Sequence, residues 1–174
     1  MNITRAATTT AIVAFLSASL LPMLGACGHK AAPDRTSPGV TTLRFFEHDT
    51  EQTSLDLGPQ GAGPGHQFIF SGDLFDHQGG SKVGHTAGQC ITFSGNATAG
   101  DVFCTATFVL DRGQITAQCL CDTAALFGRG ETVPMGIAGG TGTYSNARGD
   151  GTVQVPVNVP NQTDANLVLN VVSG

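Results

Sequence analysis

The chain is poor in charge, and poorest in positive charge. Charged residues make up 12% of its 174 residues, about half the usual ~25% of a soluble domain. The 8 Lys and Arg residues are outnumbered by 13 Asp and Glu residues, so the formal net charge is −5. The sequence offers no basic patch for nucleic acid, and we therefore exclude nucleic acid as a partner.

Several motifs of cofactor and nucleophilic chemistry are also missing. The run Gly139–Gly142 is not followed by Gly-Lys-Ser/Thr or by a helical pattern, which excludes a phosphate-binding loop. No Gly-x-Ser-x-Gly motif and no readable Ser-His-Asp order occur. The five histidines are scattered singly, and the cysteines lack the paired spacing of a zinc site. We therefore expect no metal and no cofactor.

The first 26 residues have the pattern of an export signal. Arg5 supplies a short positive region, and residues 11–21 form an apolar run that is too short to span a membrane comfortably. The segment ends in Leu24–Cys27, Leu-Gly-Ala-Cys, which resembles a bacterial lipobox. We expect cleavage before Cys27 and lipidation of its thiol, which would anchor the chain outside the cytoplasm, on the bacterial cell membrane. The alternative is an ordinary secretory signal in which Cys27 is incidental.

The chain after the signal divides into a spacer and one domain. Residues 27–40 are polar and contain proline, so they are expected to be a flexible spacer. Residues 41–174 show no helical period over three turns, whereas period-two stretches recur. Strands are predicted at 41–50, 67–75, 83–93, 102–110, 114–120, 132–138, 151–159 and 165–172. Eight short strands without helices favour an all-β fold, an eight-stranded antiparallel up-and-down β-barrel, with a β-sandwich as the alternative.

Four cysteines follow the spacer, and outside the cytoplasm an even number favours disulfides. Cys90 and Cys104 flank a loop rich in Gly, Asn and Ala whose midpoint lies near residue 97. In a hairpin folded there the two residues lie opposite each other on one face, so we predict a disulfide between them. Cys119 and Cys121 share a face of one strand, where a bridge would strain the backbone. We expect Cys119 and Cys121 to be free thiols or to pair only loosely.

Four segments resemble the allene oxide cyclase/dirigent superfamily of barrels. The glycine-rich segment 139–149, Gly-Gly-Thr-Gly-Thr-Tyr-Ser-Asn-Ala-Arg-Gly, is similar to a signature shared by both branches. Phe45–Asp49 resembles the Phe-x-x-His-Asp of dirigent proteins. Residues 71–74 and 84–90 resemble the Ser-Gly-Asp-Leu and Gly-x-Thr-Ala-Gly-x-Cys of plant cyclases, and Gly113–Gln118 resembles the opening of a barrel strand. Order and spacing agree over about residues 41 to 172.

This resemblance implies an eight-stranded barrel, often trimeric, with an apolar cavity. In that cavity a reactive small molecule would be cyclised or coupled without a cofactor. In the plant cyclases a cysteine at the place of Cys90 lines the pocket, so Cys90 is a candidate ligand-binding residue as well as a candidate disulfide partner. Asp49 stands where the cyclases have Asn, and the link 51–65 does not match, so the identity of the substrate does not transfer.

The candidate catalytic residues are Glu47, Asp49 and Arg148. Glu47 and Asp49 share a strand face with Leu43 and with Phe45, a candidate ligand-binding residue. If that face points into the barrel, burial and mutual repulsion raise the pKa of at least one carboxyl, which gives a general acid near neutral pH. In the alternative interpretation these carboxylates cap the strand or pair with an arginine.

Arg148 could neutralise a substrate carboxylate or phenolate, because its planar guanidinium suits that task. Alternatively it pairs structurally with Asp150 or Asp49. Two functions follow from these residues. One is a lipid-anchored, cofactor-free cyclase or isomerase that acts on an apolar small molecule. The other is a non-catalytic barrel that binds an apolar ligand or a partner in the cell envelope.

Overall fold

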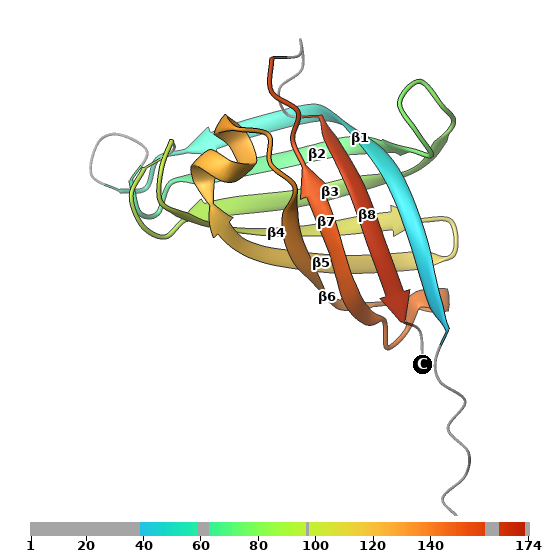
Figure 1. The fold of residues 1–174 in the computed structure, drawn as a ribbon. Helices are drawn as coiled ribbons and strands as arrows, with labels where there is room; N and C mark the ends of the chain where they lie inside the picture. The colour runs from blue at the N-terminus through green and yellow to red at the C-terminus, as the bar shows by residue number, and fades with distance from the viewer. Residues whose placement is uncertain (1–38, 59–62, 97, 159–163, 173–174) are drawn as a thin grey trace, which may run out of the picture. The chain divides into compact units, whose positions relative to one another are not determined.

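The computed structural model describes residues 39–58, 63–96, 98–158 and 164–172. Within them, eight antiparallel strands close into a barrel, each pairing with the next and the last pairing with the first (Figure 1). The strands are β1 (Val40–Leu55), β2 (Gln67–Phe75), β3 (Lys82–Thr92), β4 (Asp101–Leu110), β5 (Gly113–Asp122), β6 (Val133–Gly140), β7 (Arg148–Gln154) and β8 (Ala165–Val172). The predicted up-and-down barrel is confirmed. The predicted signal peptide and Cys27 lie outside the described residues.

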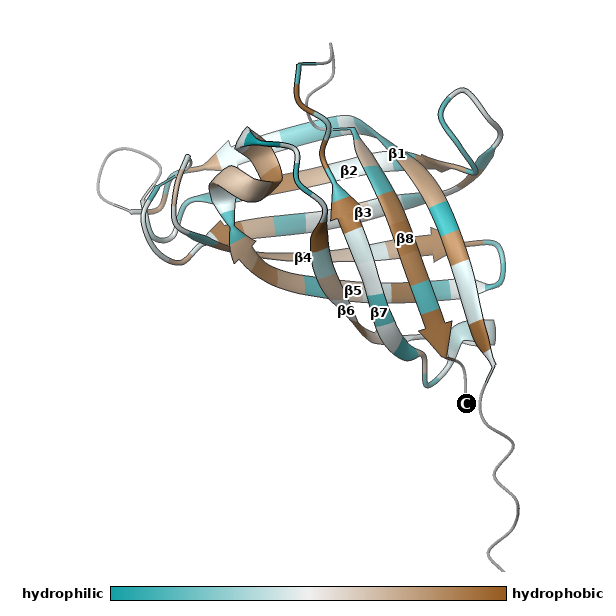
Figure 2. Ribbon diagram, in the orientation of Figure 1, coloured by the Kyte–Doolittle hydropathy of each residue, from teal (hydrophilic) through white to brown (hydrophobic). Residues whose placement is uncertain are grey.

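Alternation of side chains along each strand separates the inside of the barrel from its surface. In β8, the four residues Ala165, Leu167, Leu169 and Val171 are buried and alternate with more exposed ones. The same period appears in β6, and Figure 2 shows hydrophobic and hydrophilic bands following one another along the strands. Because successive side chains of a strand point to opposite faces, this pattern fixes which residues line the lumen.

One half of the lumen is filled by large apolar side chains. Leu74, Phe108, Ile115, Leu169 and Val171 come from β2, β4, β5 and β8, and each is at most 2% exposed. They form the centre of the hydrophobic core. The barrel is therefore a packed core at this end, and any space for a ligand must lie toward the other end.

The glycine-rich segment forms the turn between two strands. β6 ends at Gly140, and a short 3₁₀ turn, η2 (Gly142–Tyr144), follows, with Tyr144 buried. Gly142 has a φ of 62°, a left-handed conformation that favours glycine. A Cβ atom there would also lie 2.3 Å from the backbone oxygen of Arg112. The segment is therefore architectural.

Two predicted strands differ clearly from the observed ones in their bounds. β7 runs over Arg148–Gln154 instead of 151–159, because the turn ends before Arg148 and because Pro156, which has no N–H to donate, lies just beyond the strand. β1 continues to Leu55 instead of ending at Thr50, because its pairing with β2 shifts between Asp49 and Glu51. This β-bulge lets the strand continue with a changed direction of its side chains.

One further short helical element, η1 (Ala124–Gly128), follows β5 and lies at one end of the barrel (Figure 1). It carries the buried Leu126 and the partly buried Phe127. In the part of the chain that the structure describes, neither η1 nor η2 is long and apolar enough to cross a membrane.

Candidate active site

A largely apolar cavity occupies the half of the lumen that the core leaves open. Its atom-free space is about 600 Å³, including the opening to solvent. Phe68 and Phe70 of β2 and Phe127 of η1 line it, and the Phe68 and Phe70 rings stack with centroids 5.9 Å apart. The cavity therefore suits an apolar ligand, with a flat wall on the β2 side.

The cavity exists because one row of inward-facing residues is small. Gly88, Ala106 and Ala117 lie side by side on β3, β4 and β5. The next row toward the packed end holds Phe108 and Ile115, which close the lumen. A Cβ atom at Gly88 would lie 2.5 Å from the Phe70 ring, so glycine is needed there for the ring to lie across β3.

Glu47 places a carboxyl group in this apolar space. It lies on β1 opposite Leu74 of β2 and Ala165 of β8, both buried, and it is 5% exposed. Burial is the main cause that raises its pKa to about 8, and the nearby charges of Asp49 and Asp164 add to the shift. Glu47 is therefore protonated at neutral pH.

Asp49 is the second polar group of the cavity. The protonated Glu47 donates a hydrogen bond to the Asp49 carboxylate, which also raises the pKa of Glu47. Asp49 accepts a further hydrogen bond from Nε2 of Gln52 at 3.1 Å. Residues 49 and 52 would face opposite sides of a regular strand, but the β-bulge after Asp49 brings them to one side. The pair thus carries one proton at neutral pH, and the amide of Gln52 supports the charged partner.

One oxygen of Glu47 has no partner. Oε1 is buried and makes no hydrogen bond, although Glu47 lines the cavity. An unsatisfied buried polar atom costs about 1–3 kcal/mol. Because the other oxygen donates the carboxyl proton to Asp49, Oε1 is an acceptor, and a hydrogen-bond donor of a ligand that reached it would remove this cost. Oε1 is therefore a point at which the site can hold a polar group of a ligand.

His48 and Asp164 form a hydrogen-bonded pair near Glu47. Nδ1 of His48 lies 2.9 Å from Oδ1 of Asp164. His48 is not among the cavity-lining residues. Within the described ranges, no group of three His, Cys, Asp or Glu residues is arranged to hold a metal ion.

The structure brings together some of the predicted site residues and separates others. Glu47, Asp49 and Cys90 line the cavity. Phe45 is not among the lining residues; it packs against the core instead. Arg148 is exposed on β7 and is not a lining residue either, because Gly151 and Val153 hold the inward positions of that strand. We therefore leave Phe45 and Arg148 out of the site.

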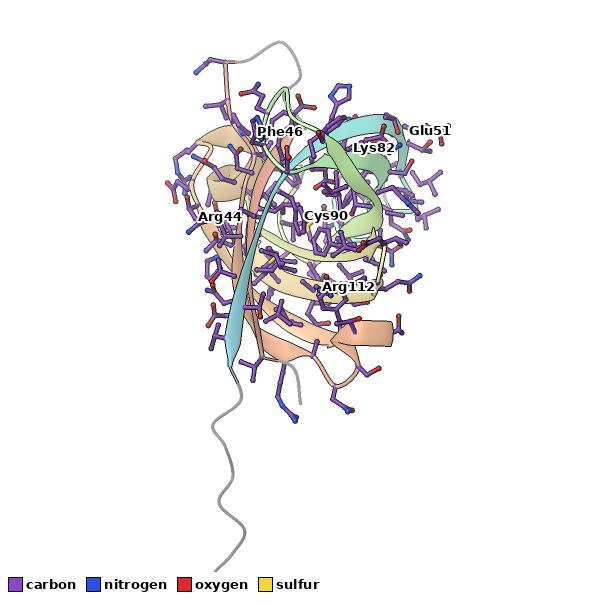
Figure 3. All side chains as sticks on the ribbon, turned by 90° about the vertical axis from the view of Figure 1, so that its right-hand side faces the viewer. Arg44, Phe46, Glu51, Lys82, Cys90 and Arg112 are labelled. Carbon is purple, nitrogen blue, oxygen red and sulfur yellow. A yellow bond between two sulfur atoms is a disulfide. The ribbon has the colours of Figure 1, made fainter. Side chains whose placement is uncertain are left out.

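The predicted disulfide is confirmed. Cys90 and Cys104 are directly opposite across β3 and β4, and their sulfur atoms are bonded. Figure 3 shows Cys90 among the side chains in the middle of the barrel, whereas Arg44 lies at its side. Cys90 is thus a disulfide partner that also lines the cavity.

Sequence reasoning missed the aromatic side chains of the cavity. Phe68 and Phe70 alternate on β2, and parity against Leu74 would have placed them inside. Phe127 had no such signal, because η1 is a single turn outside any strand pattern. Phe127 contacts Phe68 edge to face, with ring centroids 6.3 Å apart.

The fold and the cavity define an antiparallel barrel with a lumen for a small molecule. Residues 46–169 match the family model of the allene oxide cyclase barrel like domain, and the chain belongs to this family. A comparison with curated protein sequences finds no match.

Solved structures with the same fold include several enzymes. A pyocyanin demethylase is 27% identical and has a TM-score of 0.62, with 75% of this chain and 99% of that chain covered. An exo-specific intermolecular Diels-Alderase is 16% identical, with a TM-score of 0.57 and coverage of 76% and 98%. A pterocarpan synthase dirigent protein is 17% identical, with a TM-score of 0.57 and coverage of 76% and 93%. The last two likenesses show the fold alone.

The raised pKa of Glu47 predicts how stability depends on pH. The folded state keeps this proton up to about pH 8, whereas the unfolded chain releases it near 4.5. Between these values the folded state binds more protons, so its contribution to the free energy of unfolding falls as pH rises. We expect a loss of a few kcal/mol, at about 1.4 kcal/mol per pH unit, in urea unfolding from pH 5 to 8. Glu47→Gln should remove this loss.

The matched control is Glu51→Gln, which changes an exposed glutamate of the same strand. It should keep the pH dependence of the unchanged protein. Equal pH profiles for Glu47→Gln and the unchanged protein would show that Glu47 ionises normally in the folded state.

Proposed function

We propose that the chain is a cofactor-free cyclase or isomerase that acts on an apolar small molecule in the barrel cavity. The observation that carries this proposal is the unpartnered Oε1 of Glu47, a buried atom of a residue that lines a largely apolar cavity. Membership of a family of barrels with enzymes of the same fold supports it.

The cavity acts first by confinement. An apolar ligand that enters the lumen is held between Phe68 and Phe70 on one side and the small residues of β4 and β5 on the other. Its flexible parts lose freedom on binding, before the chemical step. Such positioning is worth up to ~7–11 kcal/mol in ideal intramolecular reactions.

The acid pair then supplies the polar step. A carbonyl or ether oxygen of the ligand replaces Asp49 as the acceptor of the Glu47 proton, and this hydrogen bond stabilises negative charge developing on the ligand oxygen, while Oε1 can accept from a donor of the ligand. A pKa of about 8 suits proton donation near neutral pH. The Asp49 carboxylate, held by Gln52, remains beside Glu47 and accepts its hydrogen bond when no ligand is present.

A non-catalytic barrel is the second candidate function. The cavity and the buried acid serve equally to bind an apolar ligand with one polar atom. Binding without turnover would distinguish this function from catalysis, because the same residues hold the ligand in both cases.

We also propose that the chain is exported and lipid-anchored through Cys27, in the segment that precedes the described residues. The apolar run and the Leu-Gly-Ala-Cys tetrapeptide support this proposal. Cys27→Ser should move the protein from the membrane fraction to the soluble fraction and abolish incorporation of labelled palmitate. Membrane association and labelling that persist in this variant would contradict it.

Ligand binding is tested with a neutral fluorescent probe, N-phenyl-1-naphthylamine. Ala106→Leu fills the row of small residues and should weaken binding of the probe about tenfold, which corresponds to about 1.4 kcal/mol. The matched control is Ala138→Leu, which adds the same side chain at an exposed position of β6. Equal effects of the two substitutions would show that the probe does not occupy the cavity.

Catalysis is tested by turnover of apolar polyenes that carry a carbonyl group and of unsaturated epoxides, followed by mass spectrometry. Glu47→Gln should reduce the rate about a hundredfold or more, since general acids contribute about 10²–10⁴-fold. Asp49→Asn should also lower the rate. The rate of the unchanged protein should fall above about pH 8, as Glu47 loses its proton. Full activity in both variants would exclude the acid pair, and probe binding without turnover would favour the non-catalytic function.

A further inference from the structure

Three cysteines form a row across the cavity wall. Cys90 on β3 lies opposite Cys104 on β4, and Cys104 lies opposite Cys119 on β5. All three line the cavity. Cys121 follows two residues along β5, so its side chain points to the same face. Cys119 and Cys121 are free thiols, so a buried thiol and a disulfide occupy adjacent positions of one sheet.

The register places Cys119 within bonding range of Cys104. Residues opposite each other in antiparallel strands alternate between narrow pairs and wide, hydrogen-bonded pairs about 5.5 Å apart at Cα. The Cα atoms of Cys90 and Cys104 are 4.0 Å apart, which marks a narrow pair. The backbone groups of Cys104 then face β5, so Cys104 and Cys119 form the wide pair. A Cα separation of about 5.5 Å lies in the middle of the range found for disulfides.

The order of the row also suits the chemistry of exchange. A thiolate attacks one sulfur of a disulfide while the other sulfur leaves. Cys119 and Cys90 lie on opposite sides of Cys104, on the two neighbouring strands. An attack by Cys119 on Sγ of Cys104 therefore comes from the side opposite the leaving sulfur of Cys90.

The surroundings of Cys119 favour its reactive form. The Cys121 thiol donates a hydrogen bond to Cys119, which lowers the pKa of Cys119 and raises that of Cys121. Burial opposes this effect, and the backbone N–H of Cys104 adds a second hydrogen bond that lowers the pKa of Cys119. Because the thiolate is the attacking species, these hydrogen bonds favour Cys119 as the nucleophile.

We propose that this row is a thiol–disulfide exchange site in which the disulfide moves between Cys90–Cys104 and Cys104–Cys119. The Cys119 thiolate attacks Sγ of Cys104, the new bond forms, and the bond to Cys90 breaks. Cys90 leaves as a thiolate and takes up the proton that Cys119 released. No electrons are gained or lost, so no oxidant is needed. This proposal is independent of the proposed cyclase function.

Exchange would change which thiol a ligand meets. In one form the free thiol is Cys119, beside the small residues of the first cavity. In the other form it is Cys90, which also lines a second cavity of about 540 Å³ of atom-free space that shares Phe68 and Phe127 with the first. A ligand in the lumen would therefore meet a nucleophilic sulfur in either form.

The direct test is Cys90→Ser in the full chain. The variant is treated with oxidised glutathione, and its disulfide bonds are mapped by mass spectrometry without reduction. The expected result is a Cys104–Cys119 disulfide with Cys121 free. The control Cys121→Ser should keep Cys90–Cys104. A free Cys104, or a bond between Cys104 and Cys121 in Cys90→Ser, would overturn the proposal.

A second measurement needs no change at Cys90 and covers the case in which Cys90→Ser fails to fold. The unchanged protein is incubated, quenched in acid, unfolded and labelled with N-ethylmaleimide. Exchange predicts label on Cys90 in a measurable fraction of molecules, and none on Cys90 in Cys119→Ser. Absence of label on Cys90 in the unchanged protein, or equal label in both proteins, would overturn the proposal.

Discussion

The inward position of Glu47 is the constraint that sets the chemistry of this barrel. β1 pairs on both sides, with β2 and with β8, so its two faces are fixed by closure of the barrel. A shift by one residue would turn Leu43 and Phe45 outward together with Glu47. The gain from burying the apolar neighbours therefore holds the carboxyl in the lumen. The carboxyl responds to burial by keeping its proton, because a charge there would be costly.

The cavity and the acid depend on each other through local departures from regular barrel packing. Gly88, Ala106 and Ala117 replace the large residues that fill the other half of the lumen, which leaves space next to the carboxyl. The bulge after Asp49 adds a hydrogen-bond donor to the charged member of the pair. The small residues reduce packing and the bulge interrupts regular pairing. Together they produce a polar site in a largely apolar cavity.

Alternation and loop position predicted most of the fold and part of the site. Strand parity placed Glu47 and Asp49 on one face, and the midpoint of a hairpin loop identified the Cys90–Cys104 bond. The bulge in β1 could not be predicted, because it depends on pairing with β2 and no residue pattern in the sequence indicates it. Arg148 was a candidate because of its charge, but Gly151 and Val153 take the inward positions of β7, so parity places the guanidinium on the outer face.

The central claim is that Glu47 carries a proton inside the barrel at neutral pH, and its side-chain carboxyl carbon reports this directly. A ¹³C NMR titration of the δ-carbon in selectively labelled protein, assigned with Glu47→Gln, follows the ionisation of this one group in the folded state. The buried carboxyl should titrate with a midpoint at about pH 8. A midpoint near the ordinary value of 4.5 would show that the carboxyl is charged at neutral pH, and would contradict the proposed acid.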